Sequence, residues 1–267
     1  MTGEQGVDYS IFDRPEILSV LFYPRSEWGG DSSSGRFHEI MIPVTRHVEI
    51  GARFYASGGV DPTILFFHGN GEIVADYDDL AGMYLQRGIN FLPADYRGYG
   101  RSTGNPSVST MIMDALTIFE YTQGWLKREG YSGPLLVMGR SLGSASALEI
   151  ASRYQDRIAG LVIESGFARV GPLLGLLGVS LDAHGVDEGE GFNVAKIKTF
   201  TKPLLVIHAR YDHIIDFAQG RELFEVCPSS VKRFLAIPNA NHNDLLYVGM
   251  AEYMRAIEWI TGVVKSG

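Results

Sequence analysis

The sequence Gly139-Arg140-Ser141-Leu142-Gly143 lies between a short apolar run at 135–138 and a stretch at 144–149 that is typical of a helix. A serine at a sharp turn between a strand and a helix has a strained backbone, and it needs very small residues two positions before and two after it. The helix that follows directs free N–H groups and the positive end of its dipole towards the serine, where they stabilise an oxyanion. The pattern therefore predicts a nucleophile elbow.

An acid and a histidine follow in the chain order Ser, acid, His that such a triad uses. Asp212 comes after the apolar run 204–207, and His242 comes after the apolar run 234–237. Both lie beyond the carboxyl ends of predicted strands, where a parallel sheet gathers its ligands. We expect Ser141 to attack a substrate carbonyl, His242 to take up and return the proton, and Asp212 to orient the imidazole.

Further motifs accompany the elbow. They are Phe-His-Gly-Asn-Gly-Glu at 67–72, Asp-Tyr-Arg-Gly-Tyr-Gly-Arg-Ser at 95–102 and His-Asn-Asp at 242–244. Together with the elbow they resemble the serine hydrolases of the α/β-hydrolase fold. Within these, the chain resembles the branch with HGN and HND motifs, which includes membrane-associated protein depalmitoylases and uncharacterised bacterial hydrolases. The resemblance covers roughly residues 60–265. It implies the fold, the triad and a hydrolytic reaction, and it names no substrate.

The oxyanion hole of this fold needs two backbone N–H donors, one from the residue after the nucleophile and one from the loop after the third strand. These requirements predict Leu142 and Asn70, with Gly71 as the second choice in the loop. The acid of the triad has two alternatives. Glu164 ends the strand predicted at 161–163, where some hydrolases of this fold carry their acid, and Asp216 lies four residues after Asp212.

A cap is expected between the strand that ends near Ile163 and the strand that begins at Pro203, because the connection is longer than a simple one. The resemblance places a cap or lid insertion there, at about 168–200. The glycine-laced apolar stretch 171–179 resembles a mobile flap more than a rigid helix, because each glycine costs a helix about 1 kcal/mol. Leu173 and Leu177 in this flap, together with Gly71, Glu72 and His213, are candidates for substrate binding.

The rest of the chain predicts a single α/β domain over 1–267 with a mostly parallel central sheet and helices on both faces. Apolar and polar residues alternate over 47–54, which indicates an antiparallel strand with one wet face. From Thr63 onwards, short apolar runs without alternation are separated by helical segments, and this is typical of buried parallel strands with crossover helices. Residues 108–126 and 250–264 carry apolar side chains at helical spacing.

Composition excludes several other classes of protein. The chain of 267 residues has 45% hydrophobic residues and a net charge of −8, so neither nucleic acid nor anionic lipid is an expected partner. No apolar run approaches the roughly 18 residues of a membrane span, and the N-terminus lacks the pattern of a signal peptide, so we expect the cytoplasm. The lone Cys227 allows no internal disulfide. No residue spacing indicates a metal, a dinucleotide or another cofactor.

Three functions remain open from the sequence. The first is a hydrolase of a carboxylic ester or thioester with a small-molecule acyl substrate. The second is a peptidase that resembles the serine aminopeptidases, for which Asp182, Asp187, Glu188 and Glu190 in the cap offer acidic groups to capture an amine. The third is a binding protein on the same fold without catalysis, against which the three intact triad residues argue. The oligomeric state is left open.

Overall fold

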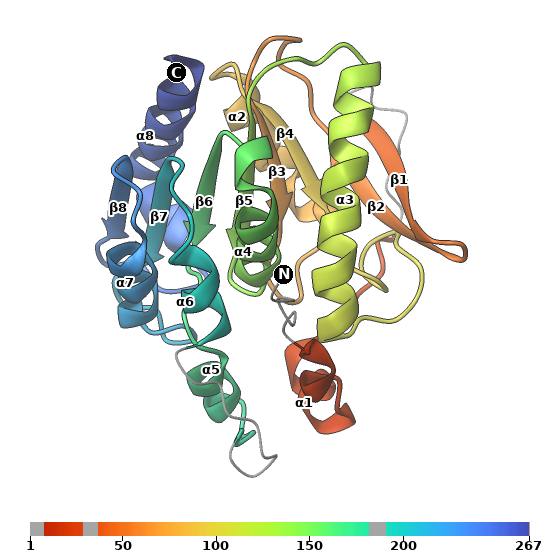
Figure 1. Cartoon of the computed structure of the whole chain (residues 1–267), viewed down its shortest axis with the longest axis vertical. Coiled ribbons are helices and arrows are strands. Elements are labelled where there is room, and N and C mark those ends of the chain that lie inside the picture. The colour runs from red at the N-terminus through yellow and green to blue at the C-terminus, as the bar shows by residue number, and fades with distance from the viewer. Residues whose placement is uncertain (1–7, 29–36, 182–190, 267) are drawn as a thin grey trace, which may run out of the picture.

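The computed structural model describes residues 8–28, 37–181 and 191–266. Within them an eight-stranded sheet has the order β1-β2-β4-β3-β5-β6-β7-β8 (Figure 1). Strands β3 to β8 are parallel, and the β1–β2 hairpin pairs antiparallel with β4. The strands are β1 (His38–Thr45), β2 (Val48–Phe54), β3 (Thr63–Phe67), β4 (Asn90–Ala94), β5 (Leu135–Arg140), β6 (Gly160–Glu164), β7 (Leu204–Ala209) and β8 (Lys232–Ile237).

Helices cover both faces of this sheet, as predicted. The α-helices are α1 (Pro15–Leu21), α2 (Asp78–Leu85), α3 (Val108–Arg128), α4 (Gly143–Tyr154), α5 (Val170–Leu176), α6 (Phe192–Ile197), α7 (Phe217–Val226) and α8 (Leu245–Ser266). Short 3-10 helices are η1 (Tyr9–Phe12), η3 (Val74–Tyr77) and η4 (Gln155–Arg157). One hydrophobic cluster joins α3, α4 and α6 to one face of the sheet, and a second joins α2 and α8 to the other. This is the α/β-hydrolase fold.

The parallel strands β3 to β7 are buried on both faces because each alternates its side chains between the two clusters. On β3, for example, Leu65 and Phe67 belong to the first cluster, whereas Ile64 and Phe66 belong to the second. All five residues of β3 are buried. The apolar runs in the sequence therefore predicted β3 to β7 correctly as buried strands. The run at 234–237 also forms a parallel strand, β8, but within it only Ile237 is buried.

The prediction of one wet face for the strand at 47–54 holds only at its start, where Glu49 is exposed, and is wrong for the rest of the strand. Gly51 and Arg53 are buried in β2, and the Arg53 side chain is only 4% exposed. Its guanidinium pairs with Glu27 at 2.5 Å and with Asp78 at 2.7 Å. Acidic residues distant in sequence thus cover this face, and a strand's own alternation cannot reveal them.

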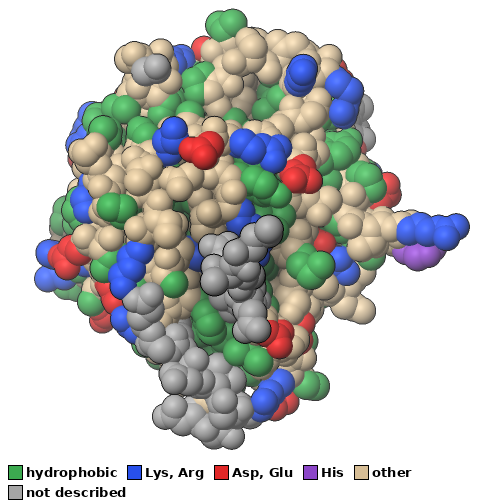
Figure 2. All heavy atoms as spheres, viewed as in Figure 1, with side chains coloured by type: hydrophobic (Ala, Val, Ile, Leu, Met, Phe, Trp, Pro, Cys, Tyr) green, Lys and Arg blue, Asp and Glu red, His purple; other side chains and the backbone are tan. Residues whose placement is uncertain are grey.

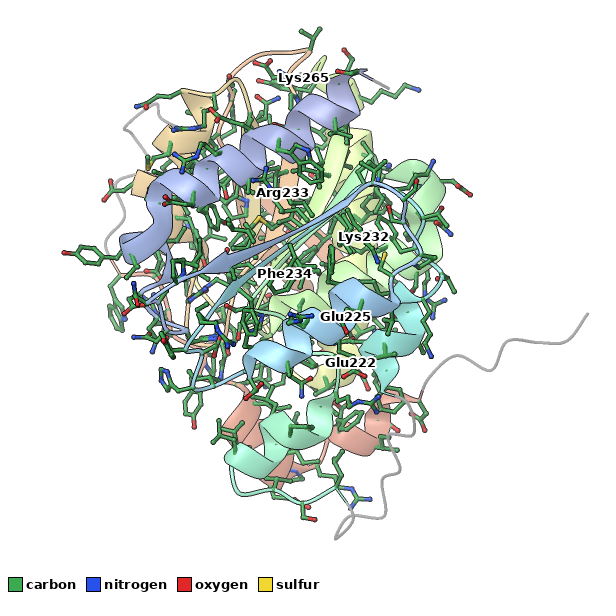
Figure 3. The ribbon with its side chains drawn as sticks, turned by 90° about the vertical axis from the view of Figure 1, so that its left-hand side faces the viewer. Glu222, Glu225, Lys232, Arg233, Phe234 and Lys265 are labelled. Atoms are coloured by element: carbon green, nitrogen blue, oxygen red, sulfur yellow. The ribbon has the colours of Figure 1, made fainter. Side chains whose placement is uncertain are left out.

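The outer strand β8 forms one edge of the sheet and carries Lys232, Arg233 and Phe234 (Figure 3). Lys232 Nζ donates to the carbonyl oxygens of Phe224 and Cys227 at 2.8 and 2.7 Å, at the end of α7. Charged residues on an edge strand discourage pairing with another chain. Cys227 is buried at the end of α7, where it packs in the core.

The segment expected to form a cap contains two short helices, α5 and α6, in its described part. The apolar stretch 171–179 includes most of α5, in which Leu174 is fully buried whereas Leu176 is 59% exposed, so the stretch is only partly packed. The N-terminal segment packs beside these helices, since the rings of Tyr9 and Phe12 both contact Phe192 of α6. The acids proposed for an amine site, Asp182, Asp187, Glu188 and Glu190, lie outside the described residues. The cap stays a prediction.

Candidate active site

Strand β5 and helix α4 meet at a turn whose geometry holds Ser141 in the left-handed region, with φ of 51°. A Cβ on Gly143 would lie 2.2 Å from the carbonyl oxygen of Phe67, and one on Gly139 would lie 2.3 Å from the carbonyl oxygen of Gly143. Real Cβ atoms do not approach backbone so closely, so both positions require glycine. The Ser141 N–H donates to the carbonyl oxygen of Glu164 at 2.8 Å, which anchors the turn to β6.

A chain of hydrogen bonds joins the serine, the histidine and the aspartate. His242 Nε2 lies 3.0 Å from Ser141 Oγ, and His242 Nδ1 lies 2.7 Å from Asp212 Oδ2. The three side chains come from the loops after β5, β7 and β8, and all three residues are buried. The parallel strands thus bring together residues that are as much as 101 positions apart in the chain.

The carboxylate of Asp212 is held in place by both of its oxygens. Oδ1 accepts hydrogen bonds from the N–H groups of Ile214 and Ile215 at 3.0 and 2.8 Å, which leaves Oδ2 for His242. His208 Nε2 lies 3.5 Å from the same Oδ2. Burial would raise the pKa of Asp212, but the hydrogen bond from His242 and the N–H donors lower it. Asp212 is therefore an ionised acceptor at neutral pH.

The two alternative acids lie elsewhere. Glu164 is buried, but its carboxylate accepts from Arg140 at 2.5 Å and from the Tyr253 hydroxyl at 2.8 Å. Asp216 is exposed and caps α7 by accepting from the Ala218 N–H at 2.7 Å. In the described structure the imidazole of His242 therefore pairs with Asp212 and not with either alternative.

The loop after β3 and the start of α4 hold the residues predicted to bind an oxyanion. Leu142 is the N-cap of α4, so its N–H lies in the first turn, where backbone N–H groups lack intrahelical acceptors. Asn70 is fixed by its side chain, whose Oδ1 accepts from the Tyr23 N–H at 2.9 Å and the Tyr99 hydroxyl at 2.8 Å. Gly71 has φ of 76°, and its carbonyl oxygen accepts from Arg25 Nε at 2.7 Å.

The N-terminal segment thus braces this loop through Tyr23 and Arg25. The sequence did not predict either residue, because nothing local in it connects them to a loop some 46 positions away. A third residue that was not predicted is Arg140. A charged residue at the end of an otherwise apolar strand, directly before Ser141, was the available signal.

Glu72, a candidate for substrate binding, faces the protein instead. Its Oε2 accepts from the Gly69 N–H at 2.7 Å and from the Tyr77 hydroxyl at 2.5 Å, and its Oε1 accepts from Arg140 at 2.9 Å. Burial alone would raise the pKa of Glu72, but Arg140 and Tyr77 more than compensate, and the pKa falls to about 2. Each carboxylate oxygen already has a partner within the protein, so the carboxylate holds the loop.

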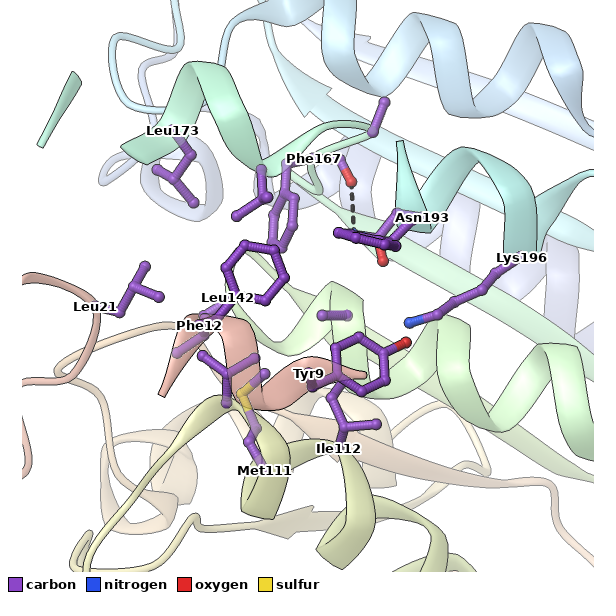
Figure 4. A pocket seen from close by; sticks show the side chains of 15 residues that line it. Tyr9, Phe12, Leu21, Met111, Ile112, Leu142, Phe167, Leu173, Asn193 and Lys196 are labelled. Carbon is purple, nitrogen blue, oxygen red and sulfur yellow. Dashed lines mark hydrogen bonds between the residues drawn. The ribbon is translucent and has the colours of Figure 1, made fainter. Parts of the chain in front are cut away.

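Two cavities adjoin the site. The first, of about 50 Å³, is almost entirely apolar, and Leu142 and Ala145 of the elbow are among the residues that line it. Phe12 and Leu21 from the N-terminal segment, Phe167 after β6 and Leu173 from the expected cap also line it, and Tyr9 and Lys196 lie across the cavity from Leu173 (Figure 4).

The second cavity, of about 290 Å³, lies beside Asp212 and His213 and is more polar. Leu173 lines both cavities, whereas Leu177 is absent from the described walls of either and packs against the core. Of the five candidates for substrate binding, Leu173 and His213 therefore line a cavity.

Among the described residues, no group of three His, Cys, Asp or Glu side chains is arranged to hold a metal ion. On the face shown in Figure 2, basic and acidic side chains are interspersed, without a basic patch. No described helix has both the length and the apolar character to cross a bilayer.

Comparison with known proteins identifies the family. The sequence profile described as "Serine aminopeptidase, S33" matches residues 58–182. Alpha/beta hydrolase domain-containing protein 17C of Mus musculus is 32% identical over 204 residues, which are 73% of this chain and 58% of that protein. Protein bem46 of Schizosaccharomyces pombe is 30% identical over 190 residues, which are 68% of this chain and 62% of that protein.

Solved structures show the same fold. The esterase Pf2001 of Pyrococcus furiosus superposes with a TM-score of 0.70 at 18% identity, covering 90% of this chain and 98% of that one. Est1E of Butyrivibrio proteoclasticus superposes with a TM-score of 0.70 at 17% identity, covering 85% and 100%. The chain belongs to the α/β-hydrolase family. The chain spans only part of the length of these relatives: 58% of the mouse 17C protein, 56% of the 17C protein of Bos taurus and 62% of bem46.

Proposed function

We propose that this protein is a serine hydrolase that cleaves a carboxylic ester or thioester through an acyl-enzyme intermediate. The observation that carries the proposal is the chain of hydrogen bonds from Ser141 Oγ through His242 to Asp212, at 3.0 and 2.7 Å. Nucleophilic serine hydrolases need this arrangement of nucleophile, base and orienting acid. Membership of the α/β-hydrolase family agrees with it.

The proposed reaction has two halves. Ser141 Oγ attacks the substrate carbonyl while His242 Nε2 takes its proton, and the N–H groups of Leu142 and Asn70 stabilise the oxyanion. His242 then gives the proton to the leaving alcohol or thiol. In the second half, His242 activates a water that attacks the acyl-serine, and Ser141 leaves with the proton. Asp212 holds the imidazole in the right tautomer throughout.

We assign the acyl group to the apolar cavity, because Leu142, the residue after Ser141, lines it. A single water needs roughly 10–15 Å³. A cavity of about 50 Å³ therefore accommodates an acyl chain of a few carbons, and longer chains meet Tyr9 and Lys196. The leaving group is assigned to the larger cavity, because Asp212, the hydrogen-bond partner of His242, lines it. Short to medium acyl groups are the expected substrates.

Covalent labelling tests the proposal. A fluorophosphonate probe is expected to label the native protein, and Ser141→Ala is expected to abolish this labelling. The same substitution is expected to lower the rate of p-nitrophenyl ester hydrolysis by about 10³-fold or more. A circular dichroism spectrum confirms that the variant is folded. Labelling that persists in Ser141→Ala would show that another residue is the nucleophile, and a folded native protein without labelling would favour the binding-protein alternative.

A peptidase is the second candidate, and the description of the matching profile as a serine aminopeptidase favours it. Such an enzyme needs a group that captures the substrate amine. The same triad would attack an amide, so the substrate separates the two functions. Comparison of aminoacyl p-nitroanilides with esters and thioesters of equal acyl length decides between them. Faster cleavage of the amides than of any ester would establish the peptidase.

A further inference from the structure

Arg140 ends β5 directly before the nucleophile, and its side chain is only 9% exposed. Its guanidinium donates three hydrogen bonds in three directions. Nε donates to Glu72 Oε1 at 2.9 Å, and Nη1 donates to Glu164 Oε1 at 2.5 Å. Nη2 donates to the backbone carbonyl oxygen of His242 at 3.0 Å. A guanidinium is planar, so these bonds fix the relative positions of their three acceptors.

Each acceptor belongs to a segment that carries part of the proposed active site. Glu72 lies in the loop after β3, two residues beyond Asn70. Glu164 ends β6, and its backbone carbonyl accepts the N–H of Ser141. The third acceptor is the backbone of His242 itself. Arg140 therefore links the oxyanion loop, the anchor of the elbow and the catalytic histidine, from a position adjacent to the nucleophile.

The two carboxylates are themselves held rigidly. Glu72 Oε2 accepts from the Gly69 N–H and the Tyr77 hydroxyl, and Glu164 Oε2 accepts from the Tyr253 hydroxyl at 2.8 Å. A further hydroxyl–hydroxyl contact of 3.1 Å joins Tyr253 to Tyr84 of α2. The hydrogen bonds therefore connect Arg140 to α2 and α8, which cover the face of the sheet with the second hydrophobic cluster. Arg140 and Glu164 are buried and Glu72 is partly buried, and such burial of charged groups is strongly unfavourable unless each group has a partner, as each has here.

We propose that Arg140 is a positioning residue that sets the imidazole of His242 against Ser141 and the oxyanion loop. The inference rests on the proposed hydrolase function. The loop of His242 follows the outer strand β8, whereas Ser141 follows the central strand β5, and the strands themselves do not touch. Arg140 supplies a direct bond across that separation. A displacement of 1 Å at a reacting group can lower the rate by as much as about 100-fold. Loss of the bond between Arg140 and the His242 carbonyl oxygen is therefore expected to slow catalysis.

The test is Arg140→Lys, which keeps the positive charge but loses the planar fork. We expect kcat for p-nitrophenyl esters to fall about 10- to 100-fold with KM changed less than about threefold, because the geometry of the reacting groups changes and the substrate cavities do not. The rate of fluorophosphonate labelling is expected to fall by the same factor as kcat. The downfield proton NMR signal of the hydrogen bond between His242 and Asp212 is expected to broaden or shift.

Arg53→Lys is the matched control. Arg53 is similarly buried and also pairs with acids, with Glu27 and Asp78 and, at 3.9 Å, with Glu39. It lies on β2, however, and in the described structure it makes no hydrogen bond or ion pair with the triad residues. We expect Arg53→Lys to lower Tm without changing kcat by more than about twofold. If the two variants lose activity equally, or if Arg140→Lys keeps full kcat, labelling rate and the NMR signal, the positioning role is wrong.

A charge-neutral variant covers the case in which Arg140→Lys fails to fold. Arg140→Met combined with Glu72→Gln and Glu164→Gln removes all three charges at similar volume, and such replacements leave stability nearly unchanged in other proteins. The folded triple variant is expected to show the same loss of kcat. A triple variant with native kcat would overturn the inference. Native protein that neither labels nor hydrolyses esters would instead refute the proposed function, so the two failures are distinct.

Discussion

At the level of single residues, the backbone at Gly143 lies so close to the end of β3 that a residue with a Cβ atom would not fit there. Gly143 begins α4 against the end of β3, since its Cα faces the carbonyl oxygens of Phe67 and His68. This contact brings the N-terminus of the helix next to the loop that carries Asn70. Both proposed oxyanion donors therefore depend on one residue that lacks a Cβ.

Gly143→Ala is expected to destabilise the fold by about 1–3 kcal/mol and to reduce kcat strongly, because the added methyl group must displace backbone. Gly262→Ala in α8 is the control, since nothing lies within 4 Å of a Cβ at that position. Replacing a helical glycine with alanine is expected to add up to about 1 kcal/mol of stability. Thermal unfolding and ester hydrolysis measure both effects. Unchanged kinetics in Gly143→Ala would contradict this account of the elbow.

The choice of acid gives a second prediction at this scale. Asp212→Asn is expected to lower kcat by about 10⁴-fold with little change in KM, because the imidazole loses its orienting carboxylate. Asp216→Asn is expected to cost far less, since Asp216 only caps α7. Glu164→Gln is expected to fall between the two, through its bond with Arg140. Steady-state kinetics of the three variants rank the acids, and a larger loss in Asp216→Asn than in Asp212→Asn would overturn the assignment.

At the level of elements, the sequence predicted the strands that are buried on both faces, because a short unbroken apolar run between helical segments is typical of such a strand. It also predicted α3 and α8 from helical spacing, and the loops that carry Ser141, Asp212 and His242 from their places after strands. It did not predict the burial of Arg53 or the packing of the N-terminal segment. These depend on partners such as Glu27 that the pattern within one element cannot locate.

Helix α5 gives a prediction that separates two neighbouring leucines. Leu173 lines both cavities, whereas Leu177 packs against the core. Leu173→Ser is expected to weaken the preference for longer acyl chains, by at most about 0.8 kcal/mol for each methylene that loses apolar contact. Leu177→Ser is expected to leave the preference unchanged. Values of kcat/KM for p-nitrophenyl esters from acetyl to octanoyl measure the effect, and equal profiles for both variants would remove α5 from the acyl site.

At the level of the whole molecule, acidic and basic side chains gather at the carboxyl ends of the parallel strands. Glu72, Glu164, Arg140 and Asp212 all lie there, in loops or at strand ends, while the two hydrophobic clusters fill the faces of the sheet. Patterns of apolar residues predict which residues are buried on the two faces of the sheet. They do not predict which charged residues pair at the carboxyl ends of the strands, because those pairs form only when the strands assemble.

Acid stability provides the last prediction. The pKa of Glu72 is about 2 in the folded protein, whereas an unfolded glutamate titrates near 4.3. A lowered folded-state pKa stabilises the protein fully above the unfolded value, and this stabilisation is lost as the pH falls towards the folded value. The difference in Tm between the native protein and Glu72→Gln is therefore expected to be largest at neutral pH, to shrink below about pH 4.5 and to vanish near pH 2. Glu129→Gln, at an exposed position after α3, is expected to follow the native curve throughout. Thermal melts at a series of pH values decide the matter, and a constant difference between the native protein and Glu72→Gln would show that the ionised carboxylate of Glu72 does not stabilise the fold.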